Sequence, residues 1–217
     1  MTAKPKQRKV RNLFLQGCIV HGRRNPFIAQ EGVPLFLIVF AAGILMVRYY
    51  NPWSGLIPAV ALVLLFMVFR DPHRYVTSVA LGVFSPVDGR VVAIERIEKG
   101  VTGAPAHRIA IKIDSMGSYT ARSPVEGTIK DLQGQGLWLQ TDEDADVILR
   151  FRGYRLGLAP RAFAEFGERL GQGQRCAYLR LARVAEVELP IEGKVLVELG
   201  QRVVAGTDVI GNVPSPR

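Results

Sequence analysis

Three short segments of the chain combine proline, an acidic residue and glycine, and their acidic residues are the first candidates for a catalytic role. Residues 85–89 read SPVDG, residues 123–127 read SPVEG and residues 189–193 read LPIEG. A carboxylate can act as a general base. In these segments, however, proline fixes φ at a turn entry and glycine permits the positive φ that reverses the chain. Glu126 and Glu192 are therefore interpreted as turn residues, whereas the role of Asp88 stays open.

Nucleophilic side chains are scarce in the last third of the chain. Residues 153–206 contain neither serine nor threonine, and Cys176 is the only thiol among them. Cys18 and Cys176 lie far apart without a partner motif, so we expect no disulfide framework and no metal site, in a reducing cytosolic setting. His107 directly precedes a predicted strand, where a lone histidine is more often a surface residue than a base.

From residue 81 onward, the pattern of residues is typical of β-strands joined by turns. Residues 90–94 and 108–113 are β-branched runs bounded by turn signals, and the second alternates apolar with polar or small residues. Residues 193–211 resemble the glycine-punctuated hairpin of barrel-sandwich carriers. Such a carrier needs a lysine at a turn tip, whereas Lys194 opens a strand, so a swinging-arm role is disfavoured. Residues 159–169 are read as either a short helix or a loop crossing.

Two apolar runs precede this part and are predicted to hold the chain to a membrane. Residues 32–47 and 53–69 carry no charge, and the turn between them holds two tyrosines and a tryptophan. Each run is near the lower length limit for crossing a hydrocarbon core of about 30 Å. The hairpin therefore either crosses the membrane and returns or enters one leaflet only. A buried core hairpin of a soluble protein is the third reading.

The positive charge of the chain is concentrated in its first 30 residues. They hold seven Lys and Arg residues and no acid, against a formal net charge of +9 for the whole chain. A basic stretch beside an apolar run is attracted to anionic lipid and marks the cytoplasmic side. Phe14 is the only Phe, Tyr or Trp among residues 4–24, which hold all seven basic residues, so the stretch does not suggest a nucleic-acid partner.

Five motifs in order resemble the phosphatidylserine decarboxylase family, in its short form with an N-terminal apolar hairpin. They are residues 29–32 (AQEG), 69–74 (FRDPHR), 85–89 (SPVDG), 109–111 (IAI) and 122–127 (RSPVEG). The resemblance covers residues 26–212. It implies a cofactor that the chain makes itself: cleavage before a serine leaves an N-terminal pyruvoyl group, whose carbonyl forms a Schiff base with the substrate amine. An Asp and a His would activate that serine.

Transferred residue by residue, the resemblance keeps the acid but not its partners. The family's acid corresponds to Asp88, its histidine position holds Tyr119, and its pyruvoyl-forming serine position holds Arg183. Tyrosine titrates near pH 10 and is a poor base at neutral pH, and arginine has no hydroxyl group. We therefore expect no pyruvoyl cofactor. Cys176 lies seven residues before Arg183 and does not replace the missing serine.

The expected architecture is α+β and mostly β. It consists of a basic tail (1–30), a membrane hairpin (31–70) and a β-rich, barrel-sandwich-like decarboxylase-type domain (71–217). Three basic residues, Arg70, Arg74 and Arg122, are candidates for meeting a lipid headgroup.

Three hypotheses on function remain. The leading one is a non-catalytic family member at the bacterial cytoplasmic membrane, with its domain on the cytoplasmic side. It would bind membrane phospholipid or a lipid-synthesis enzyme, and it could form a homo-oligomer. The second is an active decarboxylase that forms phosphatidylethanolamine, for which Asp88, Tyr119 and His107 are the residues to test. The third is a membrane-anchored adaptor that binds a protein partner.

Overall fold

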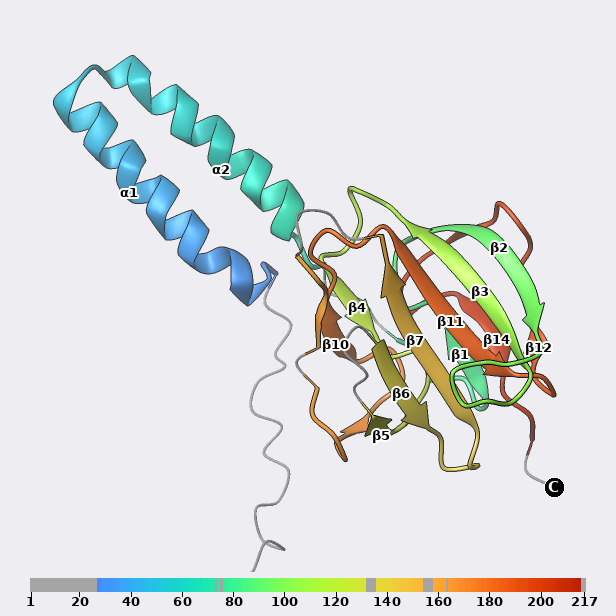
Figure 1. The fold of residues 1–217 in the computed structure, drawn as a ribbon. Coiled ribbons are helices and arrows are strands. Elements are labelled where there is room, and N and C mark those ends of the chain that lie inside the picture. Colours follow the sequence, from blue (N-terminus) through green and yellow to red (C-terminus); the bar gives the residue numbers. More distant parts are fainter. Residues whose placement is uncertain are drawn as a thin grey trace, which may run out of the picture.

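The computed structural model describes residues 27–72, 74, 76–131, 136–153, 158–162 and 164–215. They form a pair of antiparallel helices that extends away from a strand-rich domain (Figure 1). This confirms the expected fold class. Most of the predicted basic tail, including Cys18, lies outside the described residues.

The hairpin consists of two helices, each preceded by a 3₁₀ turn. These are η1 (Gln30–Gly32) and α1 (Val33–Tyr49), then η2 (Pro52–Gly55) and α2 (Leu56–Phe69). With a rise of about 1.5 Å per α-helical and 2.0 Å per 3₁₀ residue, each arm is about 30 Å long. Pro34 and Pro58 lie in first turns, where a missing N–H removes no intrahelical bond. Neither proline therefore interrupts a helix.

The surface of the hairpin is apolar and uncovered by the domain. The spans Gln30–Tyr49 and Pro52–Phe69 are each long and apolar enough to cross a membrane, and only 6% of each is buried. A core hairpin of a soluble domain would be covered by its neighbours, so that reading is wrong. The exposed apolar arms fit membrane association.

The domain is a curled, strand-rich structure made of three sheets. The strands are β1 (Gly82–Phe84), β2 (Gly89–Ile97), β3 (Ala106–Ile113), β4 (Thr120–Arg122), β5 (Gly127–Asp131), β6 (Gly136–Gln140), β7 (Asp146–Arg152), β8 (Arg161–Ala162), β9 (Arg169–Leu170), β10 (Arg175–Tyr178), β11 (Val184–Pro190), β12 (Lys194–Val195), β13 (Arg202–Val203) and β14 (Val209–Asn212). The large sheet has the order β13-β2-β3-β11-β7-β6-β5-β9, and the small sheets have the orders β1-β14-β12 and β4-β10-β8. The pairings of these described strands are all antiparallel.

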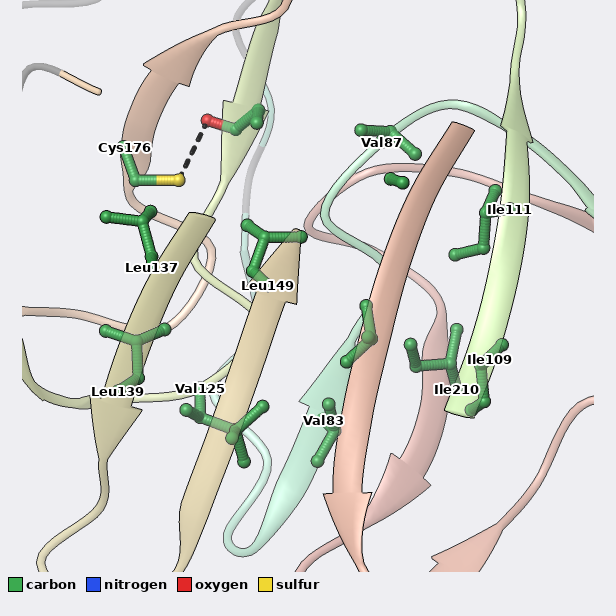
Figure 2. Close-up of a cluster of buried hydrophobic side chains, with 14 of the residues drawn as sticks. Val83, Val87, Ile109, Ile111, Val125, Leu137, Leu139, Leu149, Cys176 and Ile210 are labelled. Atoms are coloured by element: carbon green, nitrogen blue, oxygen red, sulfur yellow. Dashed lines mark hydrogen bonds between the residues drawn. The ribbon is translucent and has the colours of Figure 1, made fainter. Parts of the chain in front are cut away.

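In the part of the chain that the structure describes, an apolar core joins the three sheets. Figure 2 shows side chains from the large sheet, such as Ile111 and Leu149, facing the same interior as Val83 and Ile210 from β1 and β14. Cys176 is buried in this core, and its thiol donates to the carbonyl oxygen of Ala121 at 3.5 Å. The thiol is therefore a packed core group, remote from solvent.

The strand predictions are confirmed where the pattern was clearest. The runs 90–94 and 108–113 are β2 and β3, which pair along most of their length. In the described part of 159–169, the chain forms no helix, only β8 and the start of β9, so the loop-crossing reading holds. In the predicted C-terminal hairpin, β12 pairs with β14, whereas β13 leaves to join the edge of the large sheet.

Charged residues in the hairpin should weaken its hold on the membrane. Phe40 and Val60 are 58% and 52% exposed near the middle of their spans, and arginine at a helix centre costs about 2.5–3.5 kcal/mol on insertion scales. We expect the double variant Phe40→Arg and Val60→Arg to be released from membranes by alkaline carbonate, while the unaltered chain is retained. The control is Leu199→Arg, at a 69% exposed position of the domain. Equal release of the control and the double variant would contradict the account.

Candidate functional site

The hairpin joins the domain at a short, tightly bonded junction. Ile28 and Arg70 form an antiparallel bridge, so the chain enters α1 and leaves α2 at the same place. The carboxylate of Asp71 is completely buried there. It pairs with Arg175 at 2.7 Å and accepts the hydroxyls of Ser118 at 2.9 Å and Thr120 at 2.5 Å. Because an unpaired buried charge is costly, this set of partners fixes the end of α2 against β4 and β10.

Asp88 lies in the turn between β1 and β2 but is held by residues from elsewhere in the chain. Arg74 donates to both of its oxygens, at 2.5 and 2.6 Å, and the backbone N–H groups of Ser118 and Ala205 donate at 2.9 and 2.8 Å. Burial alone would raise the pKa of Asp88, but these hydrogen bonds outweigh burial and lower the pKa below its usual value. Asp88 is thus a fixed carboxylate.

The turn itself is closed by a serine rather than by the acid. Ser85 donates its hydroxyl to the carbonyl oxygen of Val87 at 2.7 Å, and Ser123 makes the same bond to Val125 in the second repeat. The acid of that repeat, Glu126, pairs instead with the exposed Arg169 at 2.9 Å. The shared motif therefore encodes a shared turn, and only in the first repeat does its acid reach the junction.

Tyr119 stands between the hairpin and the sheet. Its ring lies 4.7 Å from that of Phe69 and 5.9 Å from that of Tyr178, and its hydroxyl donates to Glu31 at 3.2 Å. Arg180 donates to the same carboxylate at 2.7 and 3.3 Å. Burial, together with the negative charge of Glu31, raises the pKa of Tyr119 well above its ordinary value. Tyr119 is therefore a neutral hydrogen-bond donor at neutral pH.

A cavity of about 480 Å³, here called the site pocket, opens beside this cluster. Its walls are the last turn of α2, the end of β3 with the following loop, and the loop between β10 and β11. The lining residues are Val68, Lys112, Ile113, Asp114, Ser115, Gly117, Ser118, Tyr119, Leu179, Arg180, Leu181, Ala182 and Arg183. The site pocket thus contains both positions at which the resemblance placed altered residues, Tyr119 and Arg183.

Arg183 is exposed and directly precedes β11. Its backbone is fixed on both sides: the carbonyl oxygen accepts the N–H of Ile113 at 2.8 Å, and its N–H donates to Arg152 at 3.2 Å. Asp88 does not line the site pocket but lies directly behind its wall, because a Cβ added to Gly117 would be 2.8 Å from the Cβ of Asp88. Asp88, Tyr119 and Arg183 therefore belong to one region.

The three headgroup candidates have different surroundings. Arg70 is exposed at the end of α2 and donates to the carbonyl oxygen of Met116 at 3.4 Å. Arg74 is committed to Asp88. Arg122 is only 3% exposed and donates to the carbonyl oxygens of Gly173 and Pro72. Of these three, Arg70 alone presents its charge at the surface.

Sequence reasoning missed several residues that build the region. Glu31 lies in the motif of residues 29–32 and Asp71 in the motif of residues 69–74, but no local pattern indicates the partners of either carboxylate. Lys112 occupies an exposed position of a regular strand. The alternation of apolar and polar residues in that strand predicts the exposure of Lys112 but does not indicate a functional site. His107, in contrast, lies at the beginning of β3, whereas Lys112 lies near the end of the same strand and lines the site pocket. His107 is therefore about 17 Å from Lys112 along the strand. Among the described residues, no group of His, Cys, Asp and Glu is arranged to hold a metal ion.

Replacing Asp88 by Asn should destabilise the domain, because Arg74 then loses its charged partner. Hydrogen bonds to charged groups contribute about 2 kcal/mol, equivalent to a lowering of the unfolding midpoint by about 4–8 °C. The pKa of Asp88 is lower in the folded state, so this stabilisation is present above the unfolded-state pKa near 3.9 and is lost as pH falls through the folded-state value.

The measurement is the thermal unfolding midpoint of Asp88→Asn and of the unaltered chain, in detergent, from pH 7 down to pH 3. The gap should be largest near neutral pH and should narrow at acidic pH. Glu192→Gln, at the exposed acid of the third repeat, is the matched control and should leave the midpoint unchanged. A gap for Asp88→Asn that is independent of pH would contradict this assignment.

The ion pair between Glu31 and Arg180 should fix the loop between β10 and β11. Either charge reversal, Glu31→Arg or Arg180→Glu, is expected to speed amide hydrogen exchange at Leu179 and Ala182. The N–H of Leu179 donates to the carbonyl oxygen of Tyr119, and that of Ala182 donates to the carbonyl oxygen of Leu179. The double reversal should restore slow exchange, because it restores an ion pair. Fast exchange in the double variant would show that the pair does not act in this way.

Comparison with known proteins finds curated bacterial relatives that align with most of the chain. It is 30% identical over 210 residues to the phosphatidylserine decarboxylase proenzyme of Nitrosomonas europaea, with 86% of this chain and 95% of that protein aligned. The corresponding proenzymes of Nitrosomonas eutropha and Burkholderia mallei are each 29% identical, over 86% and 88% of this chain and 95% and 97% of theirs.

Two further comparisons add little. No family model matches the chain. Among solved structures, the glucose permease IIA from Mycoplasma capricolum aligns with 64% of this chain and 98% of its own, at a TM-score of 0.44 and 16% identity.

Proposed function

Because the chain belongs to the phosphatidylserine decarboxylase family, we propose that it is a non-catalytic, membrane-bound member that binds phospholipid headgroups in the site pocket. One observation carries the proposal. Arg183 stands in the site pocket at the position where the family resemblance places the pyruvoyl-forming serine. In this proposal, the pocket beside the hairpin binds the headgroup, while Arg183 replaces the group that would react.

The residues of the site pocket do not fit a pyruvoyl group. Forming one requires a hydroxyl that attacks the preceding carbonyl, and the side chain of Arg183 has none. Two serines line the pocket, Ser115 and Ser118, but both lie in the loop after β3, and Ser118 donates its hydroxyl to Asp71. Tyr119, at the histidine position, is held as a neutral donor to Glu31.

The position and charge of the site pocket support headgroup binding. Val68, in the last turn of α2, forms part of its wall, so the pocket lies where the hairpin meets the domain. Lys112, Arg180 and Arg183 line it, and Asp114 is the only acid among its lining residues. Cationic side chains at this depth attract the phosphate groups of lipids. Arg70 adds an exposed charge at the same end of α2.

The proposed location is the bacterial cytoplasmic membrane, with the domain on the cytoplasmic side. Two helical arms return the chain to the side from which it entered, and the seven basic residues among residues 1–30 favour the cytoplasm for that side. A lipid-synthesis enzyme and a second copy of the chain remain predicted partners, and nucleic acid is not expected.

The unprocessed state should be visible directly. The chain purified from membranes is expected to run as one species of 23.9 kDa on a denaturing gel, because self-cleavage lacks its serine. The proenzyme of Nitrosomonas europaea, expressed in the same way, is the positive control for cleavage. A short C-terminal fragment beginning near residue 183 would refute the proposal.

Activity provides the second test. Membranes that contain the chain, from cells without their own decarboxylase, should release no CO₂ from phosphatidylserine above the level of empty membranes. Decarboxylation above that level would instead establish an enzyme that works through an unfamiliar residue. The chain in these membranes should still bind a phospholipid headgroup in the site pocket.

A further inference from the structure

We propose that the membrane hairpin holds one acyl chain of an anionic phospholipid in a groove between its two helices, with the phosphate of that lipid bound by Arg48. The groove lies toward the turn of the hairpin, away from the domain (Figure 1). It is separate from the site pocket and does not depend on the function proposed for that pocket. It requires only that the hairpin crosses the membrane.

The groove, here called the tip groove, has a volume of about 530 Å³ and lies between α1 and α2. The residues that define it are Phe40, Gly43, Ile44 and Arg48 of α1 and Pro58 and Ala59 of α2. Gly43 lets the helices approach closely, because a Cβ added there would lie 3.2 Å from the side chain of Pro58. Phe40 and Ile44 stay 58% and 56% exposed beside this contact. The tip groove is therefore apolar and open to the surroundings of the hairpin.

The length of the tip groove matches one leaflet of a membrane. Its lining residues on α1 extend from Val39 to Arg48, which corresponds to about 14 Å at about 1.5 Å per residue. Half of a hydrocarbon core of about 30 Å is about 15 Å. A lipid in the leaflet at the turn can therefore lay an acyl chain along the whole groove.

Arg48 brings a positive charge to the turn end of this apolar groove, in the last turn of α1. It is the only charged residue between Glu31 and Arg70, so the hairpin has no acid at this depth. Arg48 is exposed and forms no ion pair with any residue that the structure describes. Arginine binds a phosphate through two parallel hydrogen bonds. One phospholipid therefore supplies both a counter-charge for Arg48 and an apolar chain for the groove.

The charge of Arg48 also favours a lipid over a second copy of the hairpin. Copies whose domains lie on the same side of the membrane carry Arg48 at the same depth. Two copies packed groove to groove would therefore bring like charges together. An anionic lipid neutralises Arg48 instead, whereas a zwitterionic headgroup would add an ammonium that Arg48 repels. These charges select the anionic class.

The test uses the fluorescence of Trp53, an 83% exposed residue of η2 close to the tip groove. The full-length chain is placed in vesicles of equal parts phosphatidylglycerol and phosphatidylcholine, and one of the two lipids at a time carries brominated acyl chains, which quench tryptophan at close range. Trp138, on β6 of the domain, gives a constant background. Phosphatidylglycerol is expected to occupy the place beside Trp53 about fivefold more tightly than phosphatidylcholine, as expected for one basic residue acting on an anionic lipid.

Two variants separate the charge from the groove. Arg48→Gln should abolish the preference for phosphatidylglycerol, whereas Arg48→Lys should keep most of it. Ala59→Leu should also abolish the preference, because the larger side chain fills the space of the acyl chain. Ala42→Leu is the matched control, at an exposed position of α1 that does not line the tip groove. It should leave the preference unchanged, and all variants should keep the helix content of the unaltered chain by circular dichroism.

Equal quenching by the two brominated lipids in the unaltered chain would overturn the inference. A preference that survives in Ala59→Leu would also overturn it, since Arg48 would then attract anionic lipid without the groove. Quenching by both lipids that falls as the ratio of chain to lipid rises would show that a second copy occupies the groove instead. Trp53 lies at the opposite end of the hairpin from the site pocket (Figure 1). This result is therefore unaffected if the site pocket binds no lipid, and the two proposals can fail separately.

Discussion

The buried carboxylate of Asp71 determines where the membrane hairpin meets the domain. It has no contact with solvent, and Arg175, Ser118 and Thr120 provide its partners. A buried charge keeps such partners only in one arrangement, because losing any of them leaves the charge uncompensated. The end of α2, the loop after β3 and strand β10 are therefore held together. The site pocket lies against this junction, with Val68 of α2 in its wall. The hairpin is thus part of the site as well as a tether.

The same junction explains how the pocket can be maintained in the non-catalytic family member that we propose. Arg74, Ser118 and Ala205 hydrogen-bond Asp88 and so join distant segments of the chain, a structural role that needs no catalysis. Tyr119 fills the space between Phe69 and Tyr178 and bonds Glu31, so it closes the base of the hairpin. The scaffold therefore depends on Asp88 and Tyr119 for its packing. Arg183 is exposed, and its side chain forms no ion pair with any residue that the structure describes.

The sequence predicted the hairpin, the main strands and the family, because each follows from local patterns or from motifs in order. The alternation of apolar with polar or small residues at 108–113 predicts that one face of β3 is buried, and the two uncharged apolar runs predict the helices of the hairpin. The partners of charged residues could not be predicted in this way. Arg122 looked like a surface cation but is buried against the carbonyl oxygens of Gly173 and Pro72. Glu31 and Arg180 are far apart in the chain, and only the folded junction makes them a pair.

Photocrosslinking of a phospholipid with a reactive headgroup to the full-length chain in membranes tests the central claim most directly. That claim is that the family's pocket still binds lipid on an uncleaved chain. The account predicts one adduct on the domain of the intact chain, located by peptide mapping to residues 112–119 and 179–183. An adduct on the new N-terminus of a cleaved fragment, or adducts spread evenly over the domain, would contradict it.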